Sequence, residues 1–192
     1  MDVYDAALSR RSIRRFQQKP IPLETLKKVV NAARLAPSAA NLQPLEFVAV
    51  TDKELCAKIF DTIGWAAYLK PRWRPGESER PVAYVIIVFN TAIGAIKYSR
   101  HDIGLAAENL MLVAEGEGLG SCMLCSFNRD TVRALLNVPR VFEIEAMIAL
   151  GYKVETSRVE DFVDSVEYWR DKAQVFHVPK RKLSDIFHIN SF

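Results

Sequence analysis

The segment from residue 102 to about residue 118 constrains the fold of this 192-residue chain more than any other feature. It has the composition of a helix, and between Ile103 and Ala114 the only clearly polar side chains are Glu108 and Asn109. A helix that is apolar nearly all round must be buried on all sides. In a chain of this size a tight subunit interface is an easy way to bury it. We therefore expect this helix to lie at a two-fold axis and to pack partly on its own copy.

Hydrophobic periodicity, prolines and capping residues place the other elements. A helix is expected to begin at Pro22 and to end before Pro37, with Leu23, Leu26, Val30 and Ala33 on one face. Residues 84–89 are apolar on both faces, which is typical of a central strand. We further expect helices at 3–9, from Asp52 to about 63 and at 128–136. Strands are expected at 47–50, near 121–124 and at 144–150, with loops at 64–81 and 90–100. An extended stretch at 175–178 is expected to add to a sheet edge.

The positive charge of the chain is small and locally clustered. Lysines and arginines outnumber acidic residues by 26 to 23, which gives a net charge of +3. Nucleic-acid binders usually carry a concentrated basic face, so this balance argues against that class. The basic residues gather instead at Arg10–Arg15 and at Lys180–Lys182. Two short clusters far apart in sequence suit a compact anion such as a phosphate, and two solvated charge runs are the alternative.

No targeting or membrane-spanning segment is visible. The first residues lack the basic and apolar regions of a secretory signal. No uninterrupted apolar run approaches the roughly 18 residues that span a bilayer. Three cysteines, an odd number, do not suggest a disulfide framework. We therefore expect a cytoplasmic protein with neither a membrane nor a nucleic acid as partner.

Several common motifs fail on their context. The glycines at 116, 118 and 120 follow a helix, whereas a dinucleotide-binding fingerprint opens one, so a C-terminal helix cap is the better interpretation. Cys122 and Cys125 have C-x-x-C spacing, but no histidines match them, and they lie in an apolar extended segment. We interpret them as packed free cysteines and expect no metal site. Hydrolytic Ser/His/Asp chemistry has little support, so the chemistry is expected to come from a bound cofactor.

Two blocks near the N-terminus resemble the opening of the nitroreductase-like FMN-dependent oxidoreductases. They read Arg10-Arg11-Ser12-Ile13-Arg14-Arg15-Phe16 and, after a helix, Ala36-Pro37-Ser38-Ala39-Ala40-Asn41-Leu42-Gln43-Pro44. The resemblance continues through Asp102, Asn109-Leu110, Gly118-Leu119-Gly120-Ser121-Cys122, Ala149-Leu150-Gly151-Tyr152 and Pro179-Lys180-Arg181. It covers nearly the whole chain in the expected order.

The resemblance implies an α+β fold with a mixed, mainly antiparallel sheet among helices. It also implies an intertwined homodimer that holds FMN at the subunit interface. Residues 1–155 would form the FMN-binding domain. Residues 156–192 would form a C-terminal arm of the same domain, which completes the dimer and the FMN phosphate site.

The same resemblance assigns the site residues. The FMN phosphate would be bound by Arg10, by Ser12, by the backbone of Arg11, and by Lys180 or Arg181 from the tail. Guanidinium groups suit this task because they donate charge-assisted hydrogen bonds to phosphate oxygens in a fork. Arg14 would reach the pyrimidine edge of the flavin, where a positive charge raises the reduction potential.

Other residues would contact the flavin ring and ribityl chain. From the other subunit these are Pro37, Ser38, Ala39 and Asn41, with Gln43 as a further polar contact. Cys125 and Ser126 stand where the family sets backbone N–H groups against flavin N5 and O4. The family usually has a small residue in place of Cys125, and a redox role for this thiol is an open hypothesis. The loop at 64–81 has no clear counterpart: Arg72 or Arg74 could contact the pyrimidine, and Trp65, Tyr68 or Trp73 could line the acceptor pocket.

The reaction implied by the resemblance is the reduction of a small organic acceptor, such as a nitroaromatic or a quinone, by NADH or NADPH. The donor passes a hydride to the flavin and leaves, and the acceptor then enters the same space. Three alternatives stay open. They are another flavin reaction on the same scaffold (reductive dehalogenation, flavin fragmentation or dehydrogenation), an FMN-binding carrier or sensor without turnover, and a structural homodimer without cofactor.

Overall fold

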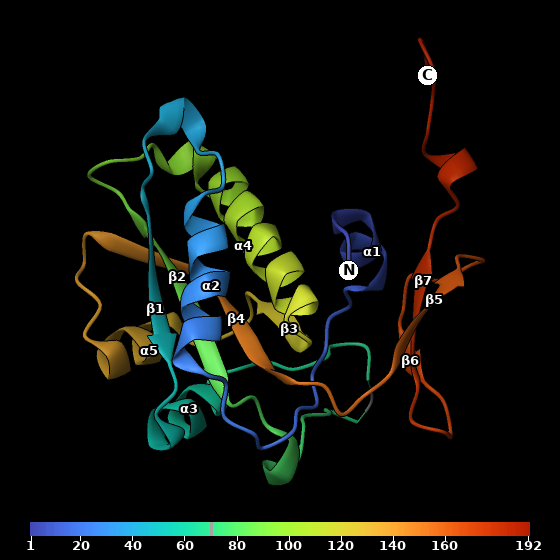
Figure 1. The fold of residues 1–192 in the computed structure, drawn as a ribbon, viewed down its shortest axis with the longest axis horizontal. Coiled ribbons are helices and arrows are strands. Elements are labelled where there is room, and N and C mark those ends of the chain that lie inside the picture. The colour runs from blue at the N-terminus through green and yellow to red at the C-terminus, as the bar shows by residue number, and fades with distance from the viewer. Residues whose placement is uncertain (70) are drawn as a thin grey trace. The chain divides into compact units, whose positions relative to one another are not determined.

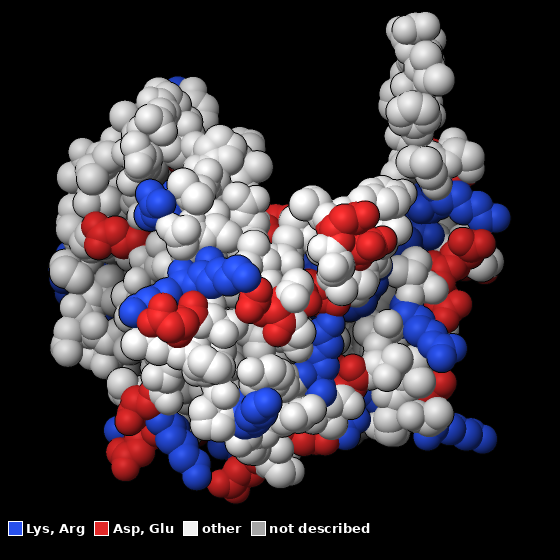
Figure 2. Space-filling view, in the orientation of Figure 1, with Lys and Arg blue, Asp and Glu red and all other residues white. Residues whose placement is uncertain are grey.

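The computed structural model describes residues 1–69 and 71–192, which form two compact units. The first unit contains residues 1–64 and 75–154, and the second contains residues 65–74 and 155–192. Figure 1 labels the helices and strands of both. On the face drawn in Figure 2, basic and acidic side chains are interspersed. Within the described ranges, no helix combines the length and apolar character needed to cross a membrane.

A four-stranded antiparallel sheet forms the centre of the first unit. Its strands are β1 (Leu45–Val50), β2 (Ala83–Asn90), β3 (Leu119–Leu124) and β4 (Phe142–Tyr152), in the order β1-β2-β4-β3. The first seven residues of β2 are all buried, which confirms the expectation for residues 84–89. In this strand order, β1 and β3 are the two edge strands.

Two long helices pack side by side on one face of this sheet (Figure 1). They are α2 (Leu23–Arg34) and α4 (Ser99–Gly116). Alternate residues of β2 point toward them, as the side-chain period of a strand requires. The shared core contains Leu26, Val29 and Ala33 of α2, Val85, Ile87 and Phe89 of β2, and Ala107, Leu110 and Ala114 of α4. Removal of this apolar area from water is the main stabilising contribution to the unit.

Shorter helices complete the first unit, and polar side chains cap the α-helices among them. They are α1 (Val3–Ser9), α3 (Lys53–Phe60), α5 (Arg129–Leu136) and the 3₁₀ helices η1 (Ala39–Asn41), η2 (Glu77–Glu79) and η3 (Ile96–Tyr98). The carboxylate of Asp52 accepts the N–H of Leu55 at 2.8 Å. The amide oxygen of Asn128 accepts the N–H of Thr131 at 3.0 Å. Each cap satisfies one of the N–H groups that a helix leaves without an internal partner.

The structure corrects several element boundaries. Pro22 flanks α2 instead of beginning it. Leu23, expected on the core face, is 63% exposed, and the buried residues of the helix are Leu26, Val29 and Ala33. Helix α3 ends at Phe60 and not near 63, and α4 begins at Ser99 inside the expected loop. Strand β4 starts early because its first residues still pair with the end of β2. The last turn of a helix and the end of a strand depend on tertiary contacts, which periodicity does not contain.

One stripe of α4 remains uncovered in the single chain. Asp102 and Ile103 are buried, but His101, Gly104 and Leu105 are exposed. One chain by itself therefore does not bury this helix on all sides. The second copy expected at this helix would have to cover this stripe.

The second unit is built on a three-stranded sheet. Strand β7 (Phe176–Lys180) lies between β5 (Ser157–Asp161), to which it is parallel, and β6 (Trp169–Arg170), to which it is antiparallel. The expectation that residues 175–178 add to a sheet edge is thus wrong, because they pair on both sides. A short 3₁₀ helix, η4 (Leu183–Asp185), follows β7.

The side chain of His177 bridges the strands of this small sheet. Its Nδ1 lies 2.6 Å from Oε1 of Glu160, and its Nε2 lies 3.1 Å from Oδ2 of Asp171. The ring also stacks on Trp169, with centroids 5.0 Å apart. Hydrogen bonds to Glu160, and then to Asp171, raise the pKa of His177 above its usual value. The protonated ring is the form that can donate to both carboxylates at once.

Candidate functional site

The basic segment after α1 lies directly against the edge strand β3. Ile13 is buried, and its N–H donates to the carbonyl oxygen of Ser121 at 2.9 Å. A Cβ on Gly120 would lie 2.7 Å from Cγ2 of Ile13, so the close approach requires glycine there. Ser12 forms an isolated bridge with Ser121, and Arg14 donates to the carbonyl oxygen of Ser12 at 3.2 Å. Because side chains alternate along an extended chain, burial of Ile13 directs Ser12 and Arg14 to the opposite side.

Two neighbouring arginines of this segment have different partners. Nε of Arg10 donates to Oε1 of Glu108, on α4, at 3.1 Å. The guanidinium of Arg11 donates to the carbonyl oxygens of Leu8 and Arg10. Burial, and then the charge of Arg10, lower the pKa of Arg11. The side chain of Arg11 thus supports the turn after α1, whereas Arg10 is oriented by an ion pair with α4.

The second block of the resemblance forms a tight loop around η1. The N–H of Gln43 donates to Oγ of Ser38 at 2.9 Å, and Nε2 of Gln43 donates to the carbonyl oxygen of Asn41 at 3.3 Å. Pro37 and Asn41 are exposed. The loop therefore fixes its own shape through short polar contacts while it presents small and amide side chains outward.

A buried carboxylate of α4 holds this loop in an unusual backbone conformation. Oδ1 of Asp102, which is 3% exposed, accepts the N–H of Ala39 at 3.0 Å. The loop has positive φ at Ala40 (50°), Asn41 (53°) and Gln43 (52°). Non-glycine residues seldom adopt this left-handed region unless the surroundings enforce it. The loop is thus shaped by a contact with a residue far away in sequence.

Cys125 and Ser126 follow the last paired residue of β3. Both are exposed, and within the described residues their backbone N–H groups meet no acceptor. The carbonyl oxygen of Ser126 accepts the N–H of Gly64 at 2.8 Å, which fixes the direction of the chain. A Cβ on Gly64 would lie 2.8 Å from Oγ of Ser126. Two successive N–H donors are therefore held open at the end of the strand.

The side chain of Arg129 explains why the strand pairing stops there. Its Nε donates to the carbonyl oxygen of Ile144 at 3.0 Å, and its Nη2 donates to those of Glu145 at 3.3 Å and Cys125 at 3.2 Å. Continued pairing of β3 with β4 would bring the N–H groups after Leu124 to this part of β4. The guanidinium occupies that place, so an N–H group that would have faced β4 there is left for another acceptor.

None of the three cysteines forms a disulfide. Cys122 is buried, as expected of a packed cysteine, but the same expectation is wrong for Cys125, which is exposed. Cys125 is exposed as a residue, yet desolvation of its thiol still raises its pKa, and the thiol form prevails at neutral pH.

Lys180 and Arg181, expected at the phosphate, belong to the second unit. Both are exposed, and Nη2 of Arg181 donates to the carbonyl oxygen of Asp185 at 2.8 Å. Arg72 and Arg74 lie in the same unit and are exposed. A contribution of any of these four residues to a flavin site stays a prediction.

The aromatic residues of the 65–74 segment take part in packing within the second unit. Tyr68 meets Tyr168 edge to face at 5.0 Å, and the guanidinium of Arg170 lies 4.4 Å from the ring centre of Trp73. Trp65 is buried. These contacts explain the three side chains as structural, and a role in an acceptor pocket stays a prediction.

Strand β3 sets the spacing of the candidate site in the first unit. Ser121 is bridged to Ser12 in the basic segment, and Cys125 follows four residues later, directly after the end of the strand. Four residues of strand span about 13 Å. The arrangement suits an elongated ligand with an anionic group at one end and hydrogen-bond acceptors at the other.

Sequence reasoning named neither Asp102 nor Glu108 as a site residue. Both are ionisable residues on a helix that is otherwise largely apolar. A buried or half-buried charge needs a partner, so each was a signal that α4 holds something in place. The sequence did not reveal that the partners are Ala39 and Arg10.

A family model described as the nitroreductase family matches residues 7–152 of the chain. The chain belongs to the nitroreductase family. The match includes the basic segment, the loop around η1 and the end of β3, so it covers every candidate site residue of the first unit. The sequence resemblance is thereby confirmed.

Similar proteins come from bacteria and archaea. A protein of Methanothermobacter thermautotrophicus described as an NADH dehydrogenase/NAD(P)H nitroreductase is 28% identical over 168 residues, which cover 85% of this chain and 84% of that protein. An NADH dehydrogenase of Thermus thermophilus is 31% identical, over 81% of this chain and 88% of its own. An iodotyrosine deiodinase of Thermotoga neapolitana is 30% identical, over 78% of this chain and 88% of its own.

Solved structures share the fold. An FMN-dependent nitroreductase of Clostridium difficile superposes with a TM-score of 0.71 at 24% identity, over 97% of this chain and 98% of that one. A protein of Desulfovibrio desulfuricans, described as a nitroreductase in complex with FMN, has a TM-score of 0.72 at 19% identity, over 100% and 98% of the two chains. These likenesses confirm the expected α+β nitroreductase-like fold.

Proposed function

We propose that this member of the nitroreductase family binds FMN and reduces a small organic acceptor, such as a nitroaromatic or a quinone, with NADH or NADPH. The reaction would be ping-pong, because donor and acceptor would use the same space in turn. Relatives described as NADH dehydrogenase and NAD(P)H nitroreductase support the donor, and solved relatives that depend on or contain FMN support the cofactor. Bound FMN would supply the hydride chemistry, so the chain needs no side-chain acid of unusual strength.

The observation that carries this proposal is the pair of open N–H groups at Cys125 and Ser126. They lie about 13 Å along β3 from the residue bridged to Ser12. In FMN, a five-carbon ribityl chain separates the ring from the phosphate by a length of this order. The two donors would hydrogen-bond N5 and O4 of the ring, while the basic segment would receive the phosphate.

The phosphate end would be bound by Arg10, Ser12 and the backbone of Arg11, with Lys180 or Arg181 added from the second unit. Glu108 accepts from Nε of Arg10, which leaves the terminal nitrogens of the guanidinium for a phosphate fork. The exposed hydroxyl of Ser12 can donate to the same group. The guanidinium of Arg14 would contact the pyrimidine edge.

The functional unit would be a homodimer. The uncovered stripe of α4 at His101, Gly104 and Leu105 would form part of the interface. Residues 37–43 would reach the flavin bound to the other subunit, with Pro37, Ser38, Ala39 and Asn41 against the ring and ribityl chain and Gln43 as a polar contact. Residues 156–192 would act as the arm that completes the dimer.

The absorbance spectrum of the purified protein tests the proposal. We expect the near-ultraviolet and blue bands of oxidised flavin, which bleach anaerobically with NADH or NADPH and return with a quinone. Bands that persist with both donors would favour a carrier or sensor instead. A colourless protein that does not reload with FMN would refute the assignment.

Variants of the basic segment sharpen this test. Arg10→Met should weaken FMN binding strongly and leave riboflavin binding nearly unchanged, because riboflavin lacks the phosphate. Arg34→Met is a matched control, because Arg34 is an exposed arginine on α2 whose side chain, within the described residues, donates to the amide oxygen of Asn31. Equal losses for FMN and riboflavin in Arg10→Met would place the phosphate elsewhere.

The thiol of Cys125 is not required by this proposal. Its raised pKa keeps it protonated, and the N–H that would face the flavin belongs to the backbone. Cys125→Ala should therefore turn over at the wild-type rate. A large loss of turnover with unchanged FMN affinity would assign redox work to the thiol.

Reductive dehalogenation is a second candidate, favoured by the iodotyrosine deiodinase of Thermotoga neapolitana among the relatives. Both reactions would need the same flavin site. Iodide release from iodotyrosine by the chemically reduced protein would support the second candidate. Rapid quinone reduction without iodide release would support the first.

A further inference from the structure

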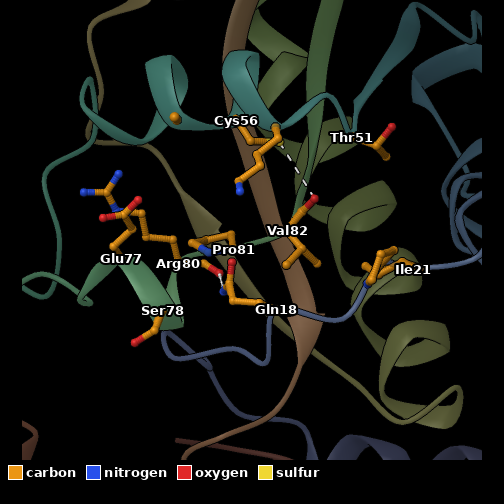
Figure 3. Close-up of a pocket in the computed structure, with 12 residues that line it drawn as sticks. Gln18, Ile21, Thr51, Cys56, Glu77, Ser78, Arg80, Pro81 and Val82 are labelled. Carbon is orange, nitrogen blue, oxygen red and sulfur yellow. Dashed lines mark hydrogen bonds between the residues drawn. The ribbon is translucent and has the colours of Figure 1, made fainter.

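A pocket in the first unit shares no residue with the candidate flavin site. Its cavity volume is about 670 Å³, within the range of small-molecule sites. It is formed by the segment before α2, by the first turns of α3 and by the chain that leads into β2 (Figure 3). Its position on three separate segments makes it a feature of the folded unit and not of one loop.

The lining of this pocket carries a net positive charge. Lys53 and Arg80 contribute two positive charges and Glu77 one negative charge, an excess of one. Within the described residues Lys53 forms no ion pair. Figure 3 shows the side chains of Glu77 and Arg80 together at one end of the pocket.

Arg80 also has an unmet hydrogen-bonding requirement. Its guanidinium carbon lies 4.3 Å from the ring centre of Phe60, and its Nε is buried without a hydrogen-bond acceptor in the described part of the chain. Arginine remains protonated in proteins, so this group keeps its charge. This Nε is closed to solvent, so an anion in the pocket would meet the positive charge of the guanidinium and not this donor.

Other parts of the lining are apolar. Ile21 lies across from Glu77 and Arg80 in Figure 3, and Pro20, Pro81 and Val82 are further apolar residues of the lining. Burial raises the pKa of Cys56 to about 11, and its thiol lies 3.8 Å from the carbonyl oxygen of Val82. The thiol is therefore an uncharged part of the wall and not a nucleophile.

We propose that this pocket binds an apolar monocarboxylate, an aliphatic or aromatic acid of about the size of octanoate. A single carboxylate matches the excess of one positive charge that Lys53 and Arg80 leave over Glu77. The carboxylate of Glu77 repels a second anionic group, which disfavours phosphates and dicarboxylates. The apolar wall takes the hydrocarbon part, whose burial drives binding. This site is independent of the flavin and of the proposed reductase activity.

Calorimetric titration of the purified protein with octanoate, octan-1-ol and octylamine tests the proposal. The three probes share a chain and differ in charge. We expect octanoate to bind at least about tenfold more tightly than the other two. Equal binding of acid and alcohol, or no binding of octanoate at about 1 mM, would overturn the proposal.

Variants on α3 locate the site. Lys53→Met should weaken octanoate binding about tenfold and leave octan-1-ol unchanged. Lys58→Met makes the same change at an exposed lysine of the same helix outside the pocket, and it should have no effect. Ala57→Trp should fill the cavity and abolish binding of both probes, with folding checked by circular dichroism. Equal effects of the two lysine variants, or octanoate binding that survives in folded Ala57→Trp, would refute the assignment.

Discussion

Replacement of Asp102 by alanine tests how the loop around η1 is held. Its carboxylate accepts the N–H of Ala39 at 3.0 Å. A hydrogen bond to a charged group contributes about 1.5–3 kcal/mol. The left-handed residues Ala40, Asn41 and Gln43 each cost about 1 kcal/mol or more, so the loop stores about 3 kcal/mol of strain. The hydrogen bond is thus comparable in size to the strain that it opposes.

We expect Asp102→Ala to lower the free energy of unfolding by about 2 kcal/mol, measured by urea denaturation. The same loss should accelerate hydrogen exchange of the Ala39 amide about 30-fold, since 1.4 kcal/mol corresponds to a factor of ten. Asp102→Asn keeps an oxygen acceptor but loses the charge. It should retain roughly half of the contribution, because charge-assisted hydrogen bonds are about twice as strong as neutral ones.

A control separates this contact from the general effect of an acidic residue near a helix N-terminus. Asp130 lies in the first turn of α5 and is exposed. Asp130→Ala should cost no more than about 1 kcal/mol, the usual effect of the helix dipole. The reasoning fails if Asp102→Asn is as damaging as Asp102→Ala. It also fails if exchange of the Ala39 amide is unchanged in the alanine variant.

Three further changes test the fold. Gly151→Ala should cost about 1–3 kcal/mol in urea unfolding, since a Cβ there would lie 2.8 Å from that of Phe16, whereas Gly76→Ala meets no atom within 4 Å and should change stability by less than about 0.5 kcal/mol. Asn128→Ala removes the cap of α5 and should cost about 1 kcal/mol in the same assay; no loss would show that the cap is replaced by water. The raised pKa of His177 means that its bonds to the two carboxylates stabilise the second unit fully below its unfolded pKa near 6.5 and weaken as the pH rises through the folded pKa. Tryptophan fluorescence in urea at several pH values should show this loss, and a wild-type pH profile in His177→Gln would contradict it.

Local signals were sufficient for most of the first unit. The cap at Asp52 and the continuous apolar run of β2 each act within a few residues, and the structure confirms both. Helix α5 begins at Arg129, one residue after its expected start, because Asn128 caps it. Gly118 has a φ of 75° after α4, as expected for a C-terminal helix cap. These features depend on the backbone preferences and periodicity of their own segment, which the sequence contains.

Long-range pairing was not visible in the same way. Residues 175–178 have the composition of an extended segment, but their central place in a sheet depends on β5 and β6, which the sequence did not reveal as strands. Both are short, polar and without clear alternation. The left-handed residues Ala40 and Gln43 were also unpredictable, because neither residue type favours that conformation. The left-handed conformation of this loop accompanies the contact between Ala39 and Asp102, which lie far apart in sequence.

The donors expected at the flavin show why a resemblance can indicate positions that composition cannot. Every residue other than proline carries a backbone N–H, so the donors at Cys125 and Ser126 leave no mark in the sequence. They become available only because β3 is an edge strand whose pairing with β4 ends at Leu124. The pairing ends there because Arg129 donates to the carbonyl oxygens of β4 and of Cys125. One side chain thus satisfies the acceptors that further pairing would have used, and an N–H group that would have faced β4 stays in solvent. The side chains at 125 and 126 are therefore not needed for these donors. Arg129 contributes to the end of the strand pairing, and its position in the sequence does not suggest this role.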